Sequence, residues 1–180
     1  MRTDAQKLHI QGMFLRIDQE YTLAAGVLKS AESLATNVTD KALIRREIGK
    51  TYLDEAVLLR EGDPVRLGAA ERYFRQSHSD LIKAGNAVET AVSFGYWGLA
   101  LFLQGDKRKG VNMLIEAHDS LSGFNDTYEL DILFTVARIS VIQRYIYAHR
   151  VWVLCKRTDE AKQWKQYLAI LAGRDRLYRF

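Results

Sequence analysis

The feature that most constrains this chain is its near-lack of proline, because its 180 residues contain only Pro64. Proline disrupts helix interiors and is frequent in turns, so a chain with a single proline can form long helices throughout. The Asn-Gly and Asp-Gly pairs that mark tight β-hairpins are absent as well. Hydrophobic residues make up 48% and charged residues 27%, as in ordinary globular domains. We therefore expect an all-α fold.

Capping residues and glycines divide the sequence into about eight expected helices. Gly62-Asp63-Pro64 is the clearest boundary, because glycine can end a helix, aspartate can cap the next and proline is tolerated in a first turn. Thr39 or Asp40 is expected to cap the third helix. Asn86 and Glu89 have the spacing of a capping box, which predicts the start of the fifth. The expected helices span residues 4–18, 20–35, 40–61, 64–84, 86–104, 106–121, 126–156 and 159–173.

Two segments share a spacing of small and apolar residues. In both, a glycine is followed after 12, 16 and 19 residues by a small residue, a leucine and an alanine: Gly12 with Ala24, Leu28 and Ala31, and Gly98 with Gly110, Leu114 and Ala117. This spacing resembles that of the tetratricopeptide-repeat family, in which a small residue on the first helix of a pair lets the second helix approach closely. The resemblance implies stacked antiparallel helix pairs in a right-handed superhelical array.

Two further units match the repeat less well. In the second pair, Ala70 and Phe74 follow Gly49, but Ala70 comes 21 residues after the glycine instead of 12. The pair therefore contains about nine extra residues, either as an insertion or as longer helices. A fourth unit is suggested near the C-terminus, although His149 stands where the small residue is expected. We expect one repeat domain over residues 1–173, followed by a short basic tail at 174–180.

The resemblance also implies a concave groove lined by the first helix of each pair. Carried over residue by residue, the groove positions are Gln6, His9, Met13 and Arg16, then Leu43, Arg46, Glu47 and Lys50, then Tyr96, Leu99, Phe102 and Leu103, and finally Gln143, Tyr147 and Arg150. The positions expected to contact a partner are His9, Met13, Arg16, Arg46, Lys50, Tyr96, Leu99, Phe102, Tyr147 and Arg150. This mixture of cations, aromatics and aliphatics would suit an acidic-apolar peptide.

The sequence favours a scaffold without catalysis, metal or cofactor. The four histidines, His9, His78, His118 and His149, lack the local spacings of zinc or di-iron helices. His78-Ser79-Asp80 contains the residue types of a catalytic triad, but a triad is assembled in space and not from consecutive residues. The lone Cys155 excludes an internal disulfide and fits a structural thiol. We therefore predict a non-enzymatic protein-interaction scaffold.

The charge distribution leaves a second function open. Residues 123–180 contain ten basic and six acidic side chains, which accounts for the whole net charge of +4. This excess fits a solvated basic surface, or a docking patch for an acidic partner or nucleic acid. Self-association through an end helix is a third hypothesis. Arginines interrupt the apolar stretch at 132–155, so no membrane span is expected, and the absence of a signal-peptide pattern favours the cytoplasm.

Overall fold

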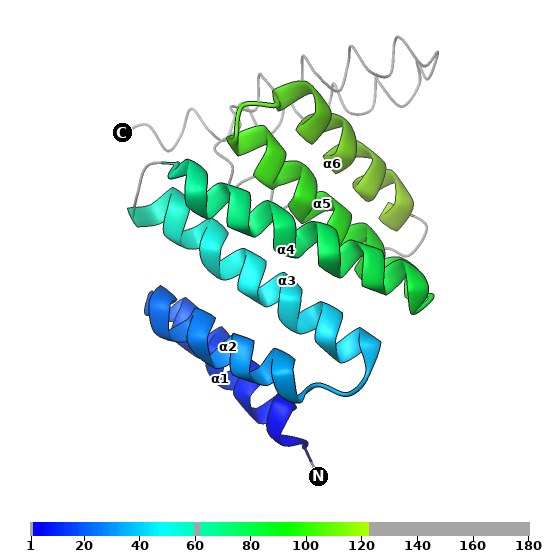
Figure 1. Cartoon of the computed structure of the whole chain (residues 1–180). Coiled ribbons are helices and arrows are strands. Elements are labelled where there is room, and N and C mark those ends of the chain that lie inside the picture. The colour runs from blue at the N-terminus through cyan, green and yellow to red at the C-terminus, as the bar shows by residue number, and fades with distance from the viewer. Residues whose placement is uncertain (1, 60–61, 123–180) are drawn as a thin grey trace, which may run out of the picture. The chain divides into compact units, whose positions relative to one another are not determined.

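Six α-helices follow one another along residues 2–59 and 62–122, which are the residues that the computed structural model describes (Figure 1). These residues contain no strand, so the all-α prediction is confirmed for them. The expected seventh and eighth helices, the domain end at residue 173 and the basic tail lie outside this part of the chain. The helices are α1 (Asp4–Ile17), α2 (Tyr21–Leu34), α3 (Val38–Asp54), α4 (Pro64–Lys83), α5 (Ala87–Leu103) and α6 (Lys107–Ser122), and the π-helical turn η1 (Glu55–Leu59) directly continues α3.

By contacts between Cα atoms, the chain separates into two units, Met1–Thr127 and Tyr128–Phe180. All six helices and η1 belong to the first unit, so everything that follows concerns that unit alone.

Local side-chain chemistry explains where most helices begin. Asp63 caps α4 by accepting hydrogen bonds from the first-turn amides, and Pro64 follows it, as the sequence predicts. Asn86 caps α5 through the amide of Glu89, also as predicted. The expected cap of α3 is wrong: Asn37, and neither Thr39 nor Asp40, occupies the cap and accepts from the amide of Asp40 at 2.6 Å. Asn37 precedes the first helical turn, so its side chain can reach amides that Thr39 and Asp40, already inside the helix, cannot reach.

The turn between α1 and α2 contains neither glycine nor proline, the two residues that most clearly mark a turn in a sequence. The residue in the left-handed region is Gln19, with φ of 64°, whereas Gly62, Gly85 and Gly105 adopt this conformation in the turns before α4, α5 and α6. A side chain other than glycine, asparagine or aspartate rarely adopts this conformation, so glutamine carries no turn signal in the sequence. The structure also shows a reciprocal capping box at the start of α1, between Thr3 and Gln6, which the sequence analysis did not identify.

The predicted glycine contacts close all three helix pairs. A Cβ placed on Gly12 of α1 would lie 2.5 Å from Cγ of Leu28 on α2, and one on Gly49 of α3 would lie 2.6 Å from the Phe74 ring of α4. In the third pair, a Cβ on Gly98 of α5 would lie 2.8 Å from the carbonyl oxygen of Gly110 on α6. Real Cβ atoms do not approach so closely, so each glycine permits its pair to pack. The shared spacing therefore corresponds to a shared contact.

The extra residues of the second pair lie mainly in its helices. α1 ends five residues after Gly12 and α5 ends five residues after Gly98, whereas α3 and η1 together continue ten residues past Gly49, to Leu59. On the other side, α4 begins six residues before Ala70, compared with three residues before Ala24 in α2. The structure thus favours longer helices over an inserted loop.

Successive helices stack in chain order, as Figure 1 shows from α1 and α2 at one end to α6 at the other. Each helix packs against the next, and α3 also contacts α1 and α5. The first helices of the three pairs are therefore neighbours. α5 packs against both α4 and α6, in agreement with the apolar character of all its sides. Fully buried leucines and aromatic residues from every pair, including Leu28, Phe74 and Leu114, form the core.

Candidate functional site

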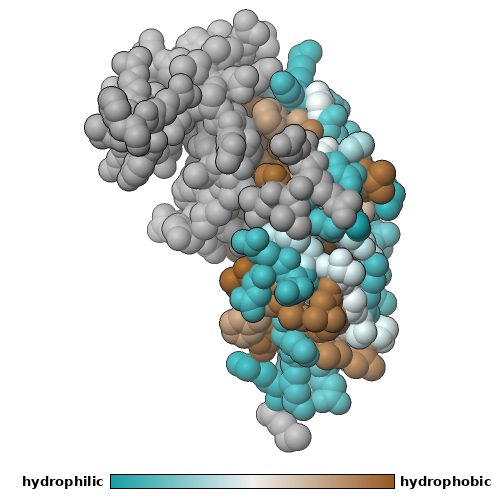
Figure 2. Space-filling view, turned by 90° about the vertical axis from the view of Figure 1, so that its left-hand side faces the viewer, coloured by the Kyte–Doolittle hydropathy of each residue, from teal (hydrophilic) through white to brown (hydrophobic). Residues whose placement is uncertain are grey.

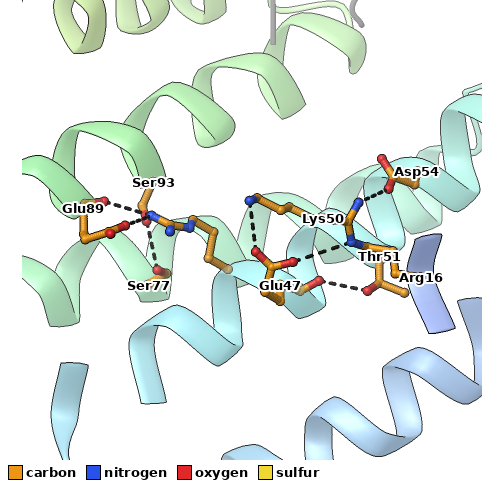
Figure 3. A network of polar contacts seen from close by, with 9 residues as sticks. Arg16, Glu47, Lys50, Thr51, Asp54, Ser77, Glu89 and Ser93 are labelled. Carbon is orange, nitrogen blue, oxygen red and sulfur yellow. Dashed lines mark hydrogen bonds and ion pairs between the residues drawn. The ribbon is translucent and has the colours of Figure 1, made fainter. Parts of the chain in front are cut away.

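A line of charged side chains on α3 joins the first helices of the three pairs (Figure 3). Arg46, Glu47, Lys50 and Asp54 recur at intervals of one, three and four residues, so they share one side of α3. This side faces α1 in one direction and α5 in the other, since α3 contacts both helices. Arg46 and Glu47 are only 7% and 5% exposed, so the line runs through the interior of the packed helices.

Toward α1, the line forms a partly buried ionic triad around Arg16. The Arg16 guanidinium lies 2.5 Å from an Asp54 oxygen and 3.5 Å from a Glu47 oxygen. Lys50 adds a second cation to Glu47, at 2.9 Å. Burial alone would raise the pKa of the Glu47 carboxyl, but Lys50 and Arg16 outweigh it and hold that pKa below its ordinary value. For Asp54 burial prevails over the attraction of Arg16, and its pKa is raised.

Toward α5, the line continues through Arg46 and Lys50. Arg46 forms an ion pair with the carboxylate of Glu89 at 2.5 Å and also donates to the Glu89 carbonyl. The Lys50 ammonium lies 4.6 Å from the centre of the Tyr96 ring, within range of a cation–π interaction. A hydrogen bond between the buried hydroxyls of Ser77 and Ser93 joins α4 to α5 nearby. The charges of α3 therefore hold α1 and α5 in fixed positions.

Four buried polar atoms in this region have no hydrogen-bond partner among the residues described. They are Nε2 of His9, Nε of Arg16, Nε of Arg46 and Oε2 of Glu47. Two of them, Nε of Arg16 and Oε2 of Glu47, face each other as an ion pair at 3.5 Å without hydrogen-bond geometry. Buried polar atoms are usually satisfied, so a group of them on adjoining helices is unusual. Burial lowers the pKa of His9, although the nearby Glu47 charge acts in the opposite direction. Burial therefore holds His9 toward its neutral form.

The pairing changes the electrostatic character expected for the groove. The sequence analysis took Arg16, Arg46 and Lys50 as cations facing a partner. In the structure, each of them pairs with a carboxylate of the same chain: Arg16 with Asp54 and Glu47, Arg46 with Glu89, and Lys50 with Glu47. Three cations against three carboxylates leave this site without net charge, so it offers polar contacts more than a field that attracts acidic ligands.

Eight of the ten predicted contact residues lie on three neighbouring helices, α1, α3 and α5, and five of them meet at the line of charges: His9, Arg16, Arg46, Lys50 and Tyr96. His9, Met13, Arg16 and Lys50 are partly exposed, while Arg46, Tyr96 and Phe102 are nearly buried and Leu99 is fully buried. The accessible part therefore lies toward α1. Tyr147 and Arg150 lie outside the part of the chain that is described, as does the basic excess of residues 123–180.

The sequence analysis did not assign Asp54 and Glu89 to the site. Asp54 follows Glu47 by seven residues, which returns it to the same side of the helix, so helical spacing could have pointed to it. Glu89 carried no such signal, because its partner Arg46 is 43 residues away in the chain.

A patch of exposed apolar side chains lies on the first helix pair. Figure 2 shows hydrophobic residues gathered near the N-terminal end of the chain. Phe14 and Ile17, one turn apart on α1, and Leu23 on α2 are all exposed. Exposed apolar residues grouped in this way are typical of surfaces that contact another protein.

Two other classes of site, a metal centre and a membrane span, have no counterpart in the described helices. In residues 2–59 and 62–122, no three histidine, cysteine or acidic side chains converge as metal ligands would. Over the same ranges, no helix combines the length and hydropathy needed to cross a membrane. The sequence matches no family model, and no curated protein or solved structure is similar enough to match it.

Proposed function

We propose that this chain is a non-catalytic scaffold that binds a segment of a partner protein across α1, α3 and α5. The observation that carries the proposal is the repeated glycine contact, Gly12 with Leu28, Gly49 with Phe74 and Gly98 with Gly110. Equivalent contacts in three successive pairs support a tetratricopeptide-like array, in which the first helices form one continuous binding surface. The array's proposed right-handed superhelix and its extension to eight helices rest on the same resemblance.

The arrangement of ionisable groups supports binding over catalysis. A catalytic acid or base needs access to substrate and a free proton-transfer position. Glu47 and Arg46 are nearly buried, and each is in an ion pair, Glu47 with Lys50 and Arg46 with Glu89. These charges fix the spacing of the helices, which is what a pre-organised binding surface requires.

The balanced charge of the site also defines the proposed ligand. A partner segment would meet the half-buried side chains of His9, Met13 and Arg16 on α1, with the Lys50 stem beside them. These offer an apolar thioether, an imidazole ring and a guanidinium group, all partly exposed. We therefore propose a segment that combines apolar side chains with hydrogen-bonding groups, of low net charge rather than strongly acidic.

A site-specific photo-crosslinker on α1 would test the groove directly. Met13 would be replaced by a photoreactive phenylalanine analogue, and Gln11 would receive the same group as a matched control. The two positions are two residues apart on α1, so their side chains point about 200° apart. Met13 is partly exposed on the groove side, whereas Gln11 is exposed on the other side. Circular dichroism would establish that both variants fold.

The proposal predicts a protein that crosslinks from position 13 and not from position 11 in a lysate of the native source. Mass spectrometry would then identify the crosslinked peptide. Equal crosslinking from both positions would contradict binding across this face. If the crosslinked material were removed by nuclease, the nucleic-acid alternative would replace the scaffold proposal. Charge reversal at Arg46 is a poorer probe, because a carboxylate there would face Glu89 in the interior and destabilise the fold.

A further inference from the structure

A hollow on the other side of α5 carries an inference beyond the proposed groove. It has a volume of about 320 Å³ and is lined by α4, α5 and α6, with residues His78, Thr90, Phe94, Glu116 and Ser120 among its walls. Phe94 and Tyr96 are two residues apart on α5, so their side chains point about 200° apart. The hollow is therefore separate from the surface formed by α1, α3 and α5.

In the preceding helix pair, the position that corresponds to Phe94 is occupied by an arginine. Arg45 lies four residues before Gly49 on α3, as Phe94 lies four residues before Gly98 on α5. The Arg45 guanidinium spans the space between α2 and α4, with Glu32 at 2.7 Å on one side and Asp80 in an ion pair on the other. All three side chains are about four-fifths buried. In this pair, a guanidinium is thus the group that fits between the two outer helices.

The chemistry of the hollow suits the same group. Phe94 presents an aromatic ring, stacked obliquely on His78 with ring centres 5.0 Å apart, and the Trp97 ring lies 6.0 Å away at an angle of 83°. Glu116 on α6 lines the opposite wall, and its carboxylate pairs with no cation among the described residues. Aromatic faces and a carboxylate together bind cations, and arginine makes both contacts better than lysine because its guanidinium is planar and weakly hydrated.

The nearby cations of the chain do not fill the hollow. The Lys109 ammonium lies 5.9 Å from the Trp97 ring centre, which shows that this aromatic cluster accepts a cation. Arg108 and Lys109 line a neighbouring hollow that also includes Glu116, but neither reaches ion-pair distance of its carboxylate. The Thr90 carbonyl oxygen lies 3.2 Å from Nδ1 of His78, which holds the imidazole of His78 against α5 at the wall of the hollow.

From the aromatic ring of Phe94 and the carboxylate of Glu116, unpaired among the described residues, we infer that the hollow between α4 and α6 binds an arginine side chain presented by a partner protein. The guanidinium stacks on the Phe94 ring and donates to the Glu116 carboxylate. The two sites differ in their polar groups as well: the positions of Glu32 and Asp80 correspond to His78 and Ser120, so the carboxylate of the hollow is Glu116. α3 supplies its own arginine, whereas α5 supplies an aromatic ring on which an external one can stack.

The test uses three short peptides and the full-length chain labelled with ¹⁵N. The probes are acetyl-Gly-Arg-Gly-amide, the citrulline peptide, which has the same shape without the charge, and the lysine peptide. We expect the arginine peptide to shift the amide resonances of residues around Phe94 and Glu116, and the citrulline peptide to leave them unchanged. Binding of the citrulline peptide with similar strength, or arginine shifts centred on other residues, would overturn the inference. Equal binding of lysine would overturn the assignment of a guanidinium.

Two substitutions separate the contributions of the wall. Glu116→Gln removes only the charge at an exposed position and should weaken the arginine peptide about fivefold. Phe94→Leu keeps an apolar side chain but removes the ring and should weaken it about threefold. Glu20→Gln, at an exposed position in the turn before α2, is the matched control and should have no effect. An unchanged affinity in Glu116→Gln, or a loss of equal size in Glu20→Gln, would show that the hollow is not the binding site.

Discussion

The backbone of Gly110 in α6 lies directly against that of Gly98 in α5. A Cβ on Gly110 would stand 2.5 Å from the carbonyl oxygen of Gly98 and 2.6 Å from the amide nitrogen of Phe102. In the other two pairs, the atoms nearest to the glycine belong to side chains, those of Leu28 and Phe74. A side chain can rotate away from a new methyl group, whereas a helix backbone must move as a whole. The third pair is therefore the least tolerant of any side chain at its glycine.

Gly110→Ala should accordingly destabilise the chain by about 3 kcal/mol, at the upper end of overpacking effects. Gly26→Ala is the matched control, because Gly26 is helical and exposed and a Cβ there would meet no atom within 4 Å. That change should stabilise the chain by about 0.5–1 kcal/mol, through helix propensity alone. Urea unfolding followed by circular dichroism measures both. Destabilisation of similar size by the two substitutions would contradict the close contact.

The glycine contacts were predictable because their signal is local and repeated. Gly12 and Gly98 precede residues of matching size at matching intervals, and that pattern can be read without knowing the fold. The ion pairs were not predictable in the same way. Arg16 and Asp54 are 38 residues apart, and their contact exists only after α1 has packed beside α3. Sequence spacing therefore identified the cations of the site but not the carboxylates that neutralise them.

The start of α3 offers a test of a single cap. Asn37→Ala should cost about 1 kcal/mol, because the amide of Asp40 loses the side-chain oxygen that accepts its hydrogen bond. Thr39→Ala should change the stability little, since Thr39 is inside the helix, where alanine has the higher propensity. The free energies of unfolding of the two variants decide the matter. A larger loss of unfolding free energy in the Thr39 variant would show that Thr39, and not Asn37, caps α3.

The sequence could not select this cap because three capping residues follow one another closely. Asn37, Thr39 and Asp40 each have a side chain that can accept from a first-turn amide. Which of them does so depends on the angle at which the chain leaves α2. Likewise, the left-handed Gln19 closes the C-terminal turn of α1, where the Glu20 amide donates to the Leu15 carbonyl oxygen, and no feature of glutamine itself predicts it.

Removal of the central charge of the ionic line should be costly. Glu47→Gln leaves Arg16 and Lys50 without a partner that they share, and breaking a buried ion pair typically costs about 3–5 kcal/mol. Arg75→Gln, which removes an exposed ion pair with Glu71, should change the stability by less than about 0.5 kcal/mol. Thermal or urea unfolding would compare them. Losses of the same size would mean that the buried line contributes no more than a surface pair.

Acidification should weaken the fold first through His9. Because burial lowers its pKa below the ordinary value of 6.5, the unfolded chain binds a proton at His9 more readily than the folded chain does. The stabilisation is complete above about pH 6.5 and is lost as the pH falls below it. The lowered pKa of Glu47 acts in a separate range, below its ordinary 4.5. His9→Gln should therefore flatten the decline in unfolding free energy between about pH 7.5 and pH 5.5.

The same titration in urea, carried out on the wild type and the His9 variant, provides the measurement. Parallel curves for the two proteins over this range would show that another group causes the pH dependence. A steeper decline in the variant would reverse the sign that burial of His9 requires.

The greater length of the α3–α4 pair distinguishes it from the other two helix pairs. Pairs of identical length are interchangeable, so a chain folding from them can join the wrong neighbours and still satisfy most contacts. Here the helices of the second pair extend further toward their connecting turn than those of the other pairs. An ion pair between Glu55 of η1 and Arg66 of α4, at 3.2 Å, joins the two extensions. If the first or the third pair took its place, these extended helix ends would lack their contacts. The additional helical turns of this pair therefore favour a single order of the three helix pairs during folding.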